Sequence, residues 1–467
     1  MEQITLRELK EATKGTLLGS SPGEEILIGG VQSDNRKIKE GDVFFAFPGE
    51  RTDGHDYVGA ALNAGAAGCV ISREPSKLLP GKFYLLVPDT FLALGDLARY
   101  YRTRFAIPTV GVTGSVGKTT TKEMIAAVLS RKYRTLKTEG NFNNNIGLPL
   151  TILRLTKQDE AAVLEMGMNH FGEISYLTRI ARPDMAVITN IGDAHIGNLG
   201  SKEGILRAKC EIFEGVPEGG TAVLNADDPY LNRLRDDLAL QNKVTLIRVG
   251  EAGDADFRAI KIDDSQAEHM SFEICFPDGK KTRVFVPAPG RHMIYPALTA
   301  AAVGKCMGLS PEQISEGIRT YTPAGMRMKI EELPGGRILL NDAYNANPQS
   351  MEAGLRILSG QKDRRRIAVI GDMGELGSRS RELHRDVGAA AAHLGVDVLI
   401  TVGIDSEEAA RKAQEDGVPK VHHCADKEEA KAVLKEYLLQ PDTALLVKAS
   451  RFMQFEELAA FIKDSVI

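Results

Sequence analysis

Residues 111–121 read Gly-Val-Thr-Gly-Ser-Val-Gly-Lys-Thr-Thr-Thr, a glycine-rich loop that ends in Gly-Lys-Thr. The apolar run 109–112 predicts a buried strand before it, and residues 119–133 predict a helix with one apolar face after it. A loop of this kind presents backbone N–H groups and a helix N-terminus to phosphate oxygens. Lys118 is expected to reach the β and γ phosphates, and the Thr119 hydroxyl to bind Mg²⁺. The stretch therefore predicts that the chain binds ATP on a parallel α/β sheet.

The loop departs from the strict pattern G-x-x-x-x-G-K-[ST] at one position. Val112 stands where the pattern has its first glycine, and Gly114 lies inside the loop instead. The alternative is a glycine-rich turn that binds nothing, which we disfavour because strand, loop, Gly-Lys-Thr and amphipathic helix coincide. The loop residues expected to hold ATP are Thr113, Gly114, Ser115, Val116, Gly117, Lys118, Thr119 and Thr120.

The length, net charge and cysteine content of the chain limit the class of protein it can be. At 467 residues the chain is too long for one ordinary domain. A net charge of -5 gives no electrostatic footprint for nucleic acid. The five cysteines are scattered and form no C-x-x-C pair, which argues against a disulfide framework. Because no signal peptide or membrane-spanning run stands out, we expect a cytoplasmic protein, and we expect a monomer.

The order of predicted elements divides the chain into three domains. Residues 1–88 form a small α/β unit. Residues 89–323 contain the glycine loop and further apolar strands, with short alternating strands at 255–286 that we expect to form an antiparallel flap. Residues 324–467 repeat a Rossmann-like βα rhythm but lack G-x-G-x-x-G, so NAD is not expected. The predicted fold class is α/β, with a central P-loop parallel-sheet ATPase domain flanked by the two other domains.

Polar side chains follow two of the central strands. Glu165 comes directly after the apolar run 161–164, and Asp193 and His195 follow a run that ends at Ile191. Ligands bind at the carboxyl ends of parallel strands, so we expect these side chains beside the triphosphate. A carboxylate and an imidazole there can hold a divalent ion that neutralises charge on the phosphoryl group. For His195 a plain loop or capping role is an equal alternative.

Four further features have ordinary structural explanations. Lys209 stands on the helical run 202–213, where spacing alone favours a solvated surface lysine. The asparagine-rich loop 141–147 suits hydrogen bonding and turn formation alike. Taken alone, Asp53-Gly54 indicates only a turn, and residues 33–36 only a polar loop.

Taken together, the motifs resemble those of the Mur ligase family over essentially the whole chain. The matching stretches are the loop 113–119, Gly140-Asn-Phe-Asn-Asn-Asn-Ile-Gly-Leu-Pro149, Glu165-Met-Gly-Met-Asn-His170, Asp193-Ala-His195, Asp342-Ala-Tyr-Asn-Ala-Asn-Pro348 with Ser350-Met351, Gly371-Asp-Met-Gly-Glu-Leu-Gly377 and Lys448-Ala-Ser-Arg451. The stretch that begins at Asp342 is similar to the signature of family members that add D-alanyl-D-alanine to UDP-N-acetylmuramoyl-tripeptide. The resemblance implies an ATP-dependent amide ligase of peptidoglycan precursor synthesis that works through an acyl phosphate.

The resemblance also implies roles for particular residues. The N-terminal domain would hold the UDP-sugar, the central domain ATP, and the C-terminal domain the dipeptide. The implied UDP-sugar contacts are Ser33, Arg36, Gly49, Asp53, Gly54 and His55. The implied ATP contacts outside the loop are Asn143, His292, Arg327 and Asp342. The implied dipeptide-side residues are Tyr344, Asn345 and Asn347.

The same resemblance implies a catalytic and metal-binding set. The catalytic residues would be Lys118, Glu165, His195 and Lys209. Mg²⁺ ions would be held by Thr119, Glu165, His195 and Lys209, the last carried as a carbamate. A carbamate turns a cation into a carboxylate-like ligand, which suits Mg²⁺.

One stretch departs from the family pattern. Where relatives read G-x-H-N-x-x-N on the adenine side, this chain reads Gly290-Arg-His-Met-Ile-Tyr-Pro296. Met293 and Pro296 replace the two asparagines, while His292 is kept. We therefore expect a rearranged adenine contact.

Two alternatives stay open. Another Mur-type ligase or a folylpolyglutamate-type ligase would share the fold and the amide-forming chemistry. A P-loop kinase or nucleotide switch would use the same loop without forming an amide. The second alternative leaves the polar sites of the two outer domains without a purpose.

Overall fold

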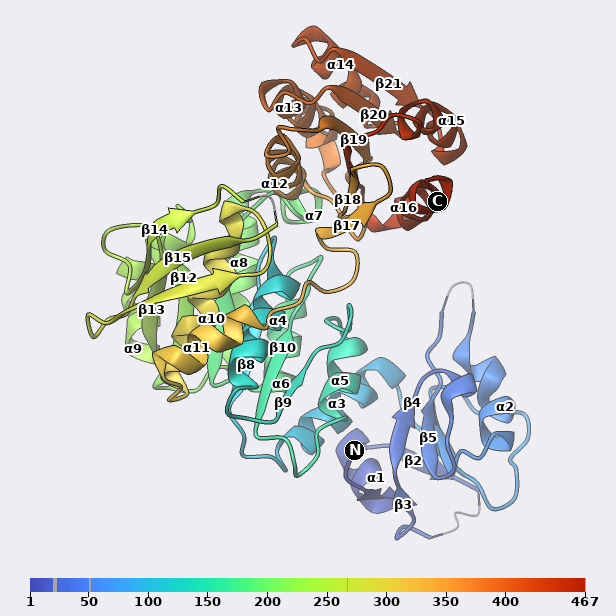
Figure 1. Cartoon of the computed structure of the whole chain (residues 1–467). Coiled ribbons are helices and arrows are strands. Elements are labelled where there is room, and N and C mark those ends of the chain that lie inside the picture. The colour runs from blue at the N-terminus through green and yellow to red at the C-terminus, as the bar shows by residue number, and fades with distance from the viewer. Residues whose placement is uncertain (20–22, 50–51, 267, 467) are drawn as a thin grey trace.

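The computed structural model describes residues 1–19, 23–49, 52–266 and 268–466. Figure 1 shows three units along the chain, the N-terminal one in blue and the C-terminal one in red, with the central unit between them. Each unit is built on its own sheet with helices against it, so the predicted α/β class is confirmed. None of the described helices combines the length and the apolar character needed to cross a membrane.

The N-terminal unit has a five-stranded sheet in the order β2-β7-β6-β5-β4, in which only the β2 pairing is antiparallel. A separate short pair joins β1 to β3. The strands are β1 (Ile4–Thr5), β2 (Thr16–Leu18), β3 (Leu27–Ile28), β4 (Gly30–Gln32), β5 (Asp42–Phe45), β6 (Gly68–Ile71) and β7 (Phe83–Leu86). The helices are α1 (Leu6–Thr13) and α2 (Val58–Asn63).

The central unit has a nine-stranded sheet in the order β16-β15-β14-β13-β12-β11-β8-β10-β9. Its strands are β8 (Thr109–Thr113), β9 (Thr135–Lys137), β10 (Ala161–Glu165), β11 (Met185–Ile188), β12 (Gly220–Asn225), β13 (Val244–Gly250), β14 (Phe257–Asp263), β15 (Met270–Cys275) and β16 (Lys281–Val286). The helices are α4 (Lys118–Leu129), α5 (Gly147–Ile152), α6 (Glu173–Ala181), α7 (Ile196–Leu199), α8 (Lys202–Cys210), α9 (Leu238–Lys243), α10 (Ile294–Cys306) and α11 (Pro311–Arg319).

The strands predicted as a flap at 255–286 are antiparallel to one another, but they do not form a separate layer. β14 pairs in parallel with β13, so the hairpins continue the central sheet. The physical reason is that the outer edge of β13 would otherwise leave backbone groups unpaired. The predicted antiparallel strands are therefore present as an extension of the central sheet, and the hairpin turn at Asp278-Gly279 lies between β15 and β16.

The C-terminal unit has a six-stranded sheet in the order β17-β18-β22-β19-β20-β21, parallel except for β17. The strands are β17 (Lys329–Leu333), β18 (Arg337–Asn341), β19 (Arg365–Gly371), β20 (Val398–Val402), β21 (Lys420–Cys424) and β22 (Thr443–Lys448). The helices are α12 (Pro348–Ser359), α13 (Ser380–His393), α14 (Glu407–Glu415), α15 (Lys427–Leu438) and α16 (Glu456–Ser465).

Helix α3 (Thr90–Arg102) joins the first two units. Asp89 caps it by accepting from the backbone N–H groups of Phe91 and Leu92, and the helix contacts α1 on one side and α5 and α6 on the other. One hydrophobic cluster consequently runs from the N-terminal unit through α3 into one face of the central sheet. The C-terminal unit instead has its own clusters, one on each face of its sheet.

Candidate active site

The phosphate loop lies between β8 and α4 and is held by the neighbouring strand. Gly114 adopts φ +149, and a Cβ there would meet Thr189 Oγ1 at 1.8 Å, so the position requires glycine. Gly117, with φ 81, is the N-cap of α4. Asn190 accepts from the backbone N–H of Ser115 through its carbonyl at 3.0 Å and from that of Val116 through Oδ1 at 2.9 Å. The loop thus has a fixed shape that exposes the start of α4.

Lys118 begins helix α4 and is partly buried. Its Nζ donates to the carbonyl of Gly114 at 2.8 Å. Burial lowers the pKa of Lys118, and the nearby Glu165 carboxylate opposes that shift. An ammonium that is poorly solvated in its own site gains most from an incoming phosphate.

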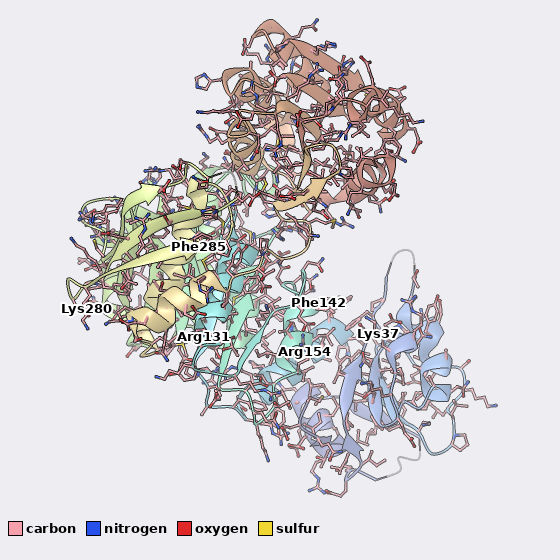
Figure 2. The ribbon with its side chains drawn as sticks, viewed as in Figure 1. Lys37, Arg131, Phe142, Arg154, Lys280 and Phe285 are labelled. Carbon is pink, nitrogen blue, oxygen red and sulfur yellow. The ribbon has the colours of Figure 1, made fainter. Side chains whose placement is uncertain are left out.

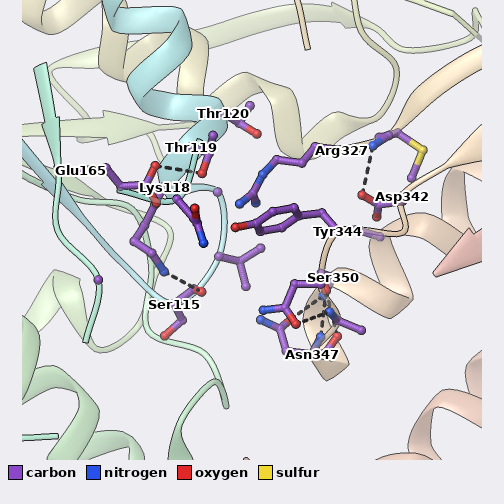
Figure 3. A pocket seen from close by; sticks show the side chains of 18 of the residues that line it. Ser115, Lys118, Thr119, Thr120, Glu165, Arg327, Asp342, Tyr344, Asn347 and Ser350 are labelled. Carbon is purple, nitrogen blue, oxygen red and sulfur yellow. Dashed lines mark hydrogen bonds between the residues drawn. The ribbon is translucent and has the colours of Figure 1, made fainter. Parts of the chain in front are cut away.

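Glu165 links the phosphate loop to the asparagine loop. Its side chain is buried at the end of β10, where Oε2 accepts from Thr119 Oγ1 and Oε1 from Asn143 Nδ2, both at 2.8 Å. Thr138 Oγ1 accepts from the Glu165 backbone N–H at 3.0 Å. Figure 3 shows Glu165 beside Thr119 and Lys118 at the start of α4. One hydroxyl and one carboxylate, both oxygen ligands of the kind that Mg²⁺ prefers, therefore meet at the loop.

Lys209 is only 1% exposed, so the solvated position favoured by its spacing is wrong. It lies on the buried face of α8 and forms no ion pair among the residues that the structure describes. Burial and the nearby Lys118 charge lower the pKa of Lys209 well below its usual value. Helix α8 packs this face against the rest of the central unit. The spacing of charged residues within one helix does not reveal that packing. A neutral amine is the form that reacts with CO₂ to give a carbamate.

His195 follows β11 in a left-handed backbone conformation with φ 64. The residue lines the same cavity as the phosphate loop. Its Nδ1 lies 2.5 Å from Oε2 of Glu375, which belongs to the C-terminal unit. The contact with His195 lowers the pKa of Glu375, and so does the charge of Lys118. His195 is thus placed at the meeting point of two units.

The C-terminal unit supplies the opposite wall of the cavity. The Arg327 guanidinium stacks over the Tyr344 ring, with 4.0 Å from Cζ to the ring centroid. Asp342 is engaged within its own unit, where Oδ1 accepts from the Met328 backbone N–H at 3.0 Å and Oδ2 pairs with Lys448 Nζ at 2.5 Å. Figure 3 shows Arg327 and Tyr344 facing the side on which Thr119 and Lys118 lie. The wall therefore presents a guanidinium and an aromatic ring to the phosphate loop.

The predicted dipeptide-side residues lie on the segment between β18 and α12. Tyr344, Asn345 and Asn347 all line the cavity, whose volume is 410 Å³. Asn347 is the N-cap of α12 and forms a capping box with Ser350. The Asn347 side chain therefore bonds to its own helix. The Asn345 carbonyl accepts from Lys448 Nζ at 2.9 Å, and its side-chain Oδ1 accepts from the Arg451 backbone N–H at 3.3 Å.

The adenine-side departure lies at the start of α10. His292 lines the cavity, and burial lowers its pKa. Met293 and Pro296 are both buried, and Met293 joins the apolar cluster on this face of the central sheet. Of the two residues that replace the asparagines, Met293 still lines the cavity, whereas Pro296 does not.

The predicted UDP-sugar residues do not lie in this cavity but in the N-terminal unit. Arg36 pairs with Asp34, which caps the short turn that begins at Asn35. His55 has both ring nitrogens engaged, Nδ1 with Asp53 at 2.7 Å and Nε2 with the Ser72 backbone N–H at 3.0 Å. Gly49 and Gly54 allow close backbone packing, since added Cβ atoms would lie 2.6 Å from Thr52 O and 2.7 Å from Phe47 N. Ser33 lies in the same segment as Arg36.

Comparison with known proteins agrees with the three-unit architecture. Three family descriptions match: "Mur ligase family, catalytic domain" over residues 27–102, "Mur ligase middle domain" over 112–304 and "Mur ligase, glutamate ligase domain" over 326–451. A UDP-N-acetylmuramoyl-tripeptide–D-alanyl-D-alanine ligase of Bacillus subtilis is 37% identical over 471 residues, covering 100% of this chain and 99% of that protein. The chain belongs to the Mur ligase family. The resemblance read from the motifs is confirmed.

Solved structures resemble this Mur ligase over nearly its full length. MurF from Acinetobacter baumannii matches with a TM-score of 0.90 and 33% identity, covering 99% of each chain. MurF from Thermotoga maritima in complex with ADP matches with a TM-score of 0.81 and 28% identity, covering 94% of this chain and 97% of that one. The similarity thus includes the arrangement of all three units.

The oxygen ligands in the cavity of this Mur ligase suit Mg²⁺, an ion that binds few protein groups, better than a metal ion that is enclosed by protein ligands alone. Within the described ranges, no cluster of three or more His, Cys, Asp or Glu residues could enclose an ion. Mg²⁺ commonly takes one or two protein ligands and completes its shell with phosphates and water. Thr119 and Glu165 fit such a site because their oxygens already lie together beside the loop.

Sequence reasoning missed several residues around the site of this Mur ligase. Asn190 holds the phosphate loop, and its place after a buried strand was a usable signal. Lys448 belongs to the family stretch 448–451, but the sequence does not show that it is 2% exposed and pairs with Asp342, far away in the chain. Glu375 belongs to a stretch already noted as a family motif, but nothing in the sequence connects it to His195. Contacts between two units leave no periodic pattern in the sequence, so they cannot be predicted from it.

Proposed function

We propose that the protein is an ATP-dependent ligase that joins D-alanyl-D-alanine to UDP-N-acetylmuramoyl-tripeptide. The observation that carries the proposal is one cavity lined by the phosphate loop of the central unit and by residues 342–347 of the C-terminal unit. A cavity of this kind lets a phosphorylated carboxylate meet an amine brought by a second unit. The full-length similarity to ligases of that name supports the choice of substrates.

The first step activates a carboxylate. The terminal carboxylate oxygen of the tripeptide attacks the γ phosphorus of ATP, the bond to the β–γ bridging oxygen breaks, and ADP leaves with that electron pair. Lys118 and the N–H groups at the start of α4 stabilise the charge that develops on the phosphoryl oxygens. Glu165 and Thr119 would hold Mg²⁺, which supplies further neutralisation of phosphate charge.

The second step forms the amide. The amine nitrogen of D-alanyl-D-alanine attacks the carbonyl carbon of the acyl phosphate. As the tetrahedral intermediate collapses, the bond from that carbon to the phosphate oxygen breaks, and hydrogen phosphate leaves with the proton that the amine has lost. We assign Tyr344, Asn345 and Asn347 to the dipeptide side and Arg327 to the phosphate side. Closing the cavity between the two units keeps water from the acyl phosphate.

We assign further residues to roles that follow from their positions. His195 and a carbamate on Lys209 complete the metal site, and the burial and lowered pKa of Lys209 support a reactive neutral amine. Asn143 and His292 contact the nucleotide. Ser33, Arg36, Gly49, Asp53, Gly54 and His55 form the UDP-sugar site, in which His55 shapes the backbone because its ring nitrogens are already engaged.

The alternative ligases and the kinase or switch predict different products. A folylpolyglutamate-type ligase adds an amino acid to another acceptor, and a kinase leaves a stable phosphorylated product. The stretch Asp342–Pro348 and the 37% identity to a tripeptide ligase favour the dipeptide reaction over both.

The test is ADP release measured with UDP-N-acetylmuramoyl-tripeptide in the presence and absence of D-alanyl-D-alanine. Sustained release is expected only with both substrates, together with a product whose mass is that of tripeptide plus dipeptide less water. Substituting L-alanyl-L-alanine or glutamate provides the control for acceptor chemistry. Release that is indifferent to the dipeptide would count against the proposal.

A further inference from the structure

Two residues with unusual backbone face each other where the central and C-terminal units meet. His195 and Glu375 both adopt φ 64, the left-handed region that non-glycine residues rarely occupy. Such outliers persist where the surrounding structure holds them, and they cluster at functional sites. In both cases the side chain is directed to the same place, because His195 Nδ1 and Glu375 Oε2 are 2.5 Å apart.

The backbone on each side of this pair is held as well. The Gly197 N–H donates to the Glu375 carbonyl at 3.2 Å. A Cβ on Gly197 would lie 2.9 Å from the backbone nitrogen of Gly377, and one on Gly377 would lie 2.9 Å from the Gly197 Cα. Both positions therefore need glycine for the two chains to approach this closely. The close approach brings the Glu375 carboxylate to the imidazole.

A second contact joins the same two units without touching His195. Asp193 is 5% exposed and pairs with Arg379 Nη1 at 3.1 Å, and its backbone N–H donates to Gln349 Oε1 at 3.2 Å. Docking of the C-terminal unit and orientation of the imidazole are thus carried by different side chains, and variants can separate them.

We propose that Glu375 is a positioning residue that orients His195 for the metal site. His195 Nδ1 is buried and forms no hydrogen bond with the described residues, and the Glu375 carboxylate, 2.5 Å away, is the group placed to pair with it. Pairing on that side leaves Nε2 for the cavity that His195 lines. A metal-binding histidine commonly gives its other ring nitrogen to a carboxylate, which fixes the tautomer and raises the basicity of the ligand. Here the carboxylate comes from another unit, so the metal site is complete only when the C-terminal unit is docked. The inference rests on the proposed Mg²⁺ site at His195.

The experiment measures Mn²⁺ affinity by electron paramagnetic resonance on the full chain with a non-hydrolysable ATP analogue. The variants are Glu375→Gln, Arg379→Gln, His195→Asn and, as matched control, Glu415→Gln. Glu415 is a similarly exposed, ion-paired glutamate of the same unit, on α14. Glu375→Gln should weaken Mn²⁺ binding about 10- to 100-fold, as loss of a partner of a metal ligand does. Glu415→Gln should bind as the parent does.

The outcomes separate three explanations. Weakening in Glu375→Gln that exceeds that in Arg379→Gln, with a raised KM for Mg²⁺ and recovery in Glu375→Asp, supports positioning. Equal weakening in Glu375→Gln and Arg379→Gln overturns it, because docking alone would then explain the effect. If His195→Asn weakens binding and Glu375→Gln does not, this inference fails while the proposed metal site stands. If His195→Asn leaves Mn²⁺ affinity unchanged, the metal role of His195 fails and this inference with it.

Discussion

At the residue scale, two lysines of the central unit are shielded from solvent, and we propose a different role for each. Lys118 stands at the N-terminus of α4, in the loop that we propose to bind phosphate, and Lys209 is buried with no carboxylate paired to it in the described part of the chain. Because an unpaired buried ammonium is unfavourable, we infer that each lysine gains its partner from a bound or attached group, phosphate for Lys118 and CO₂ for Lys209. Their variants should therefore differ in stability and in rate.

Lys118→Ala should lower kcat by about 10²- to 10³-fold, because it removes the positive charge that stabilises the transferring phosphoryl group. The fold should be retained, since the pKa of Lys118 is lowered by burial and the charge is not part of a stabilising ion pair. ADP release gives the rate and circular dichroism the fold. Wild-type turnover in this variant would exclude the loop as the ATP site.

Lys209→Met should lower turnover by about 100-fold while leaving the thermal midpoint equal or higher, since methionine fills a similar volume without an unpaired amine. Labelled bicarbonate provides an independent readout. The parent protein should show a carbamate signal by ¹³C nuclear magnetic resonance, and the variant should lack it. An active parent without that signal contradicts the carbamate assignment.

At the element scale, helix α4 is tied to the strand beside it by charge. Lys122 is fully buried, donates to the Thr138 carbonyl and pairs with Glu123 at 2.8 Å, and Glu123 also contacts Lys137 on β9. Thr138 in turn accepts from the Glu165 backbone N–H. The position of helix α4 is thus linked through Thr138 to the position of Glu165.

Glu123→Gln should destabilise the protein by about 3 kcal/mol at neutral pH, because it leaves Lys122 buried without its partner. Burial by itself would raise the pKa of Glu123, but the bonds and charges of Lys122 and Lys137 outweigh it and lower the pKa. A lowered carboxyl pKa contributes stability that is present above the unfolded value of about 4.3 and is lost as the pH falls through the folded value. Thermal midpoints of parent and variant should therefore differ at pH 7 and converge below pH 4. A constant difference would contradict this account.

The sequence predicts most elements because their apolar runs and turn residues are local. Helix α11 shows this clearly, because Ser310 caps its N-terminus, Pro311 stands in its first turn and Gln313 completes a capping box with Ser310, all within four residues. The burial of Lys209 could not be predicted, because helix α8 is rich in charge and its buried face is set by packing from other elements. The contact of His195 with Glu375 could not be predicted either, because the two residues are distant in the chain. The domain limits at 88 and 323 and the residue roles stay predictions.

At the scale of the whole molecule, the cavity depends on how the C-terminal unit sits on the central one. Figure 2 labels Phe142 and Arg154 on the side of the central unit that faces Lys37 of the N-terminal unit. Phe142 is 46% exposed on the asparagine loop. The cavity is thus lined by the phosphate loop, by the asparagine loop and by the C-terminal unit.

Gly197→Val should displace the C-terminal unit, since its added atoms would collide with the backbone near Gly377. We expect a larger radius of gyration by small-angle X-ray scattering and a fall in kcat/KM of about 10-fold or more, because a small misplacement of reacting groups is costly. The control is Gly59→Ala in α2, where an added Cβ meets nothing within 4 Å. Unchanged scattering with reduced activity would argue for a local effect at His195 instead.

The apolar cluster that passes through α3 has a consequence for how the chain melts. Because the N-terminal unit shares its interior with the central one, calorimetry should record a single heat-absorption peak for residues 1–323 and a second, separate peak for the remainder. A fragment that stops at residue 323 should accordingly survive on its own. One that begins at residue 104 should precipitate, since it would uncover the surface that Leu94, Leu97 and Tyr101 cover.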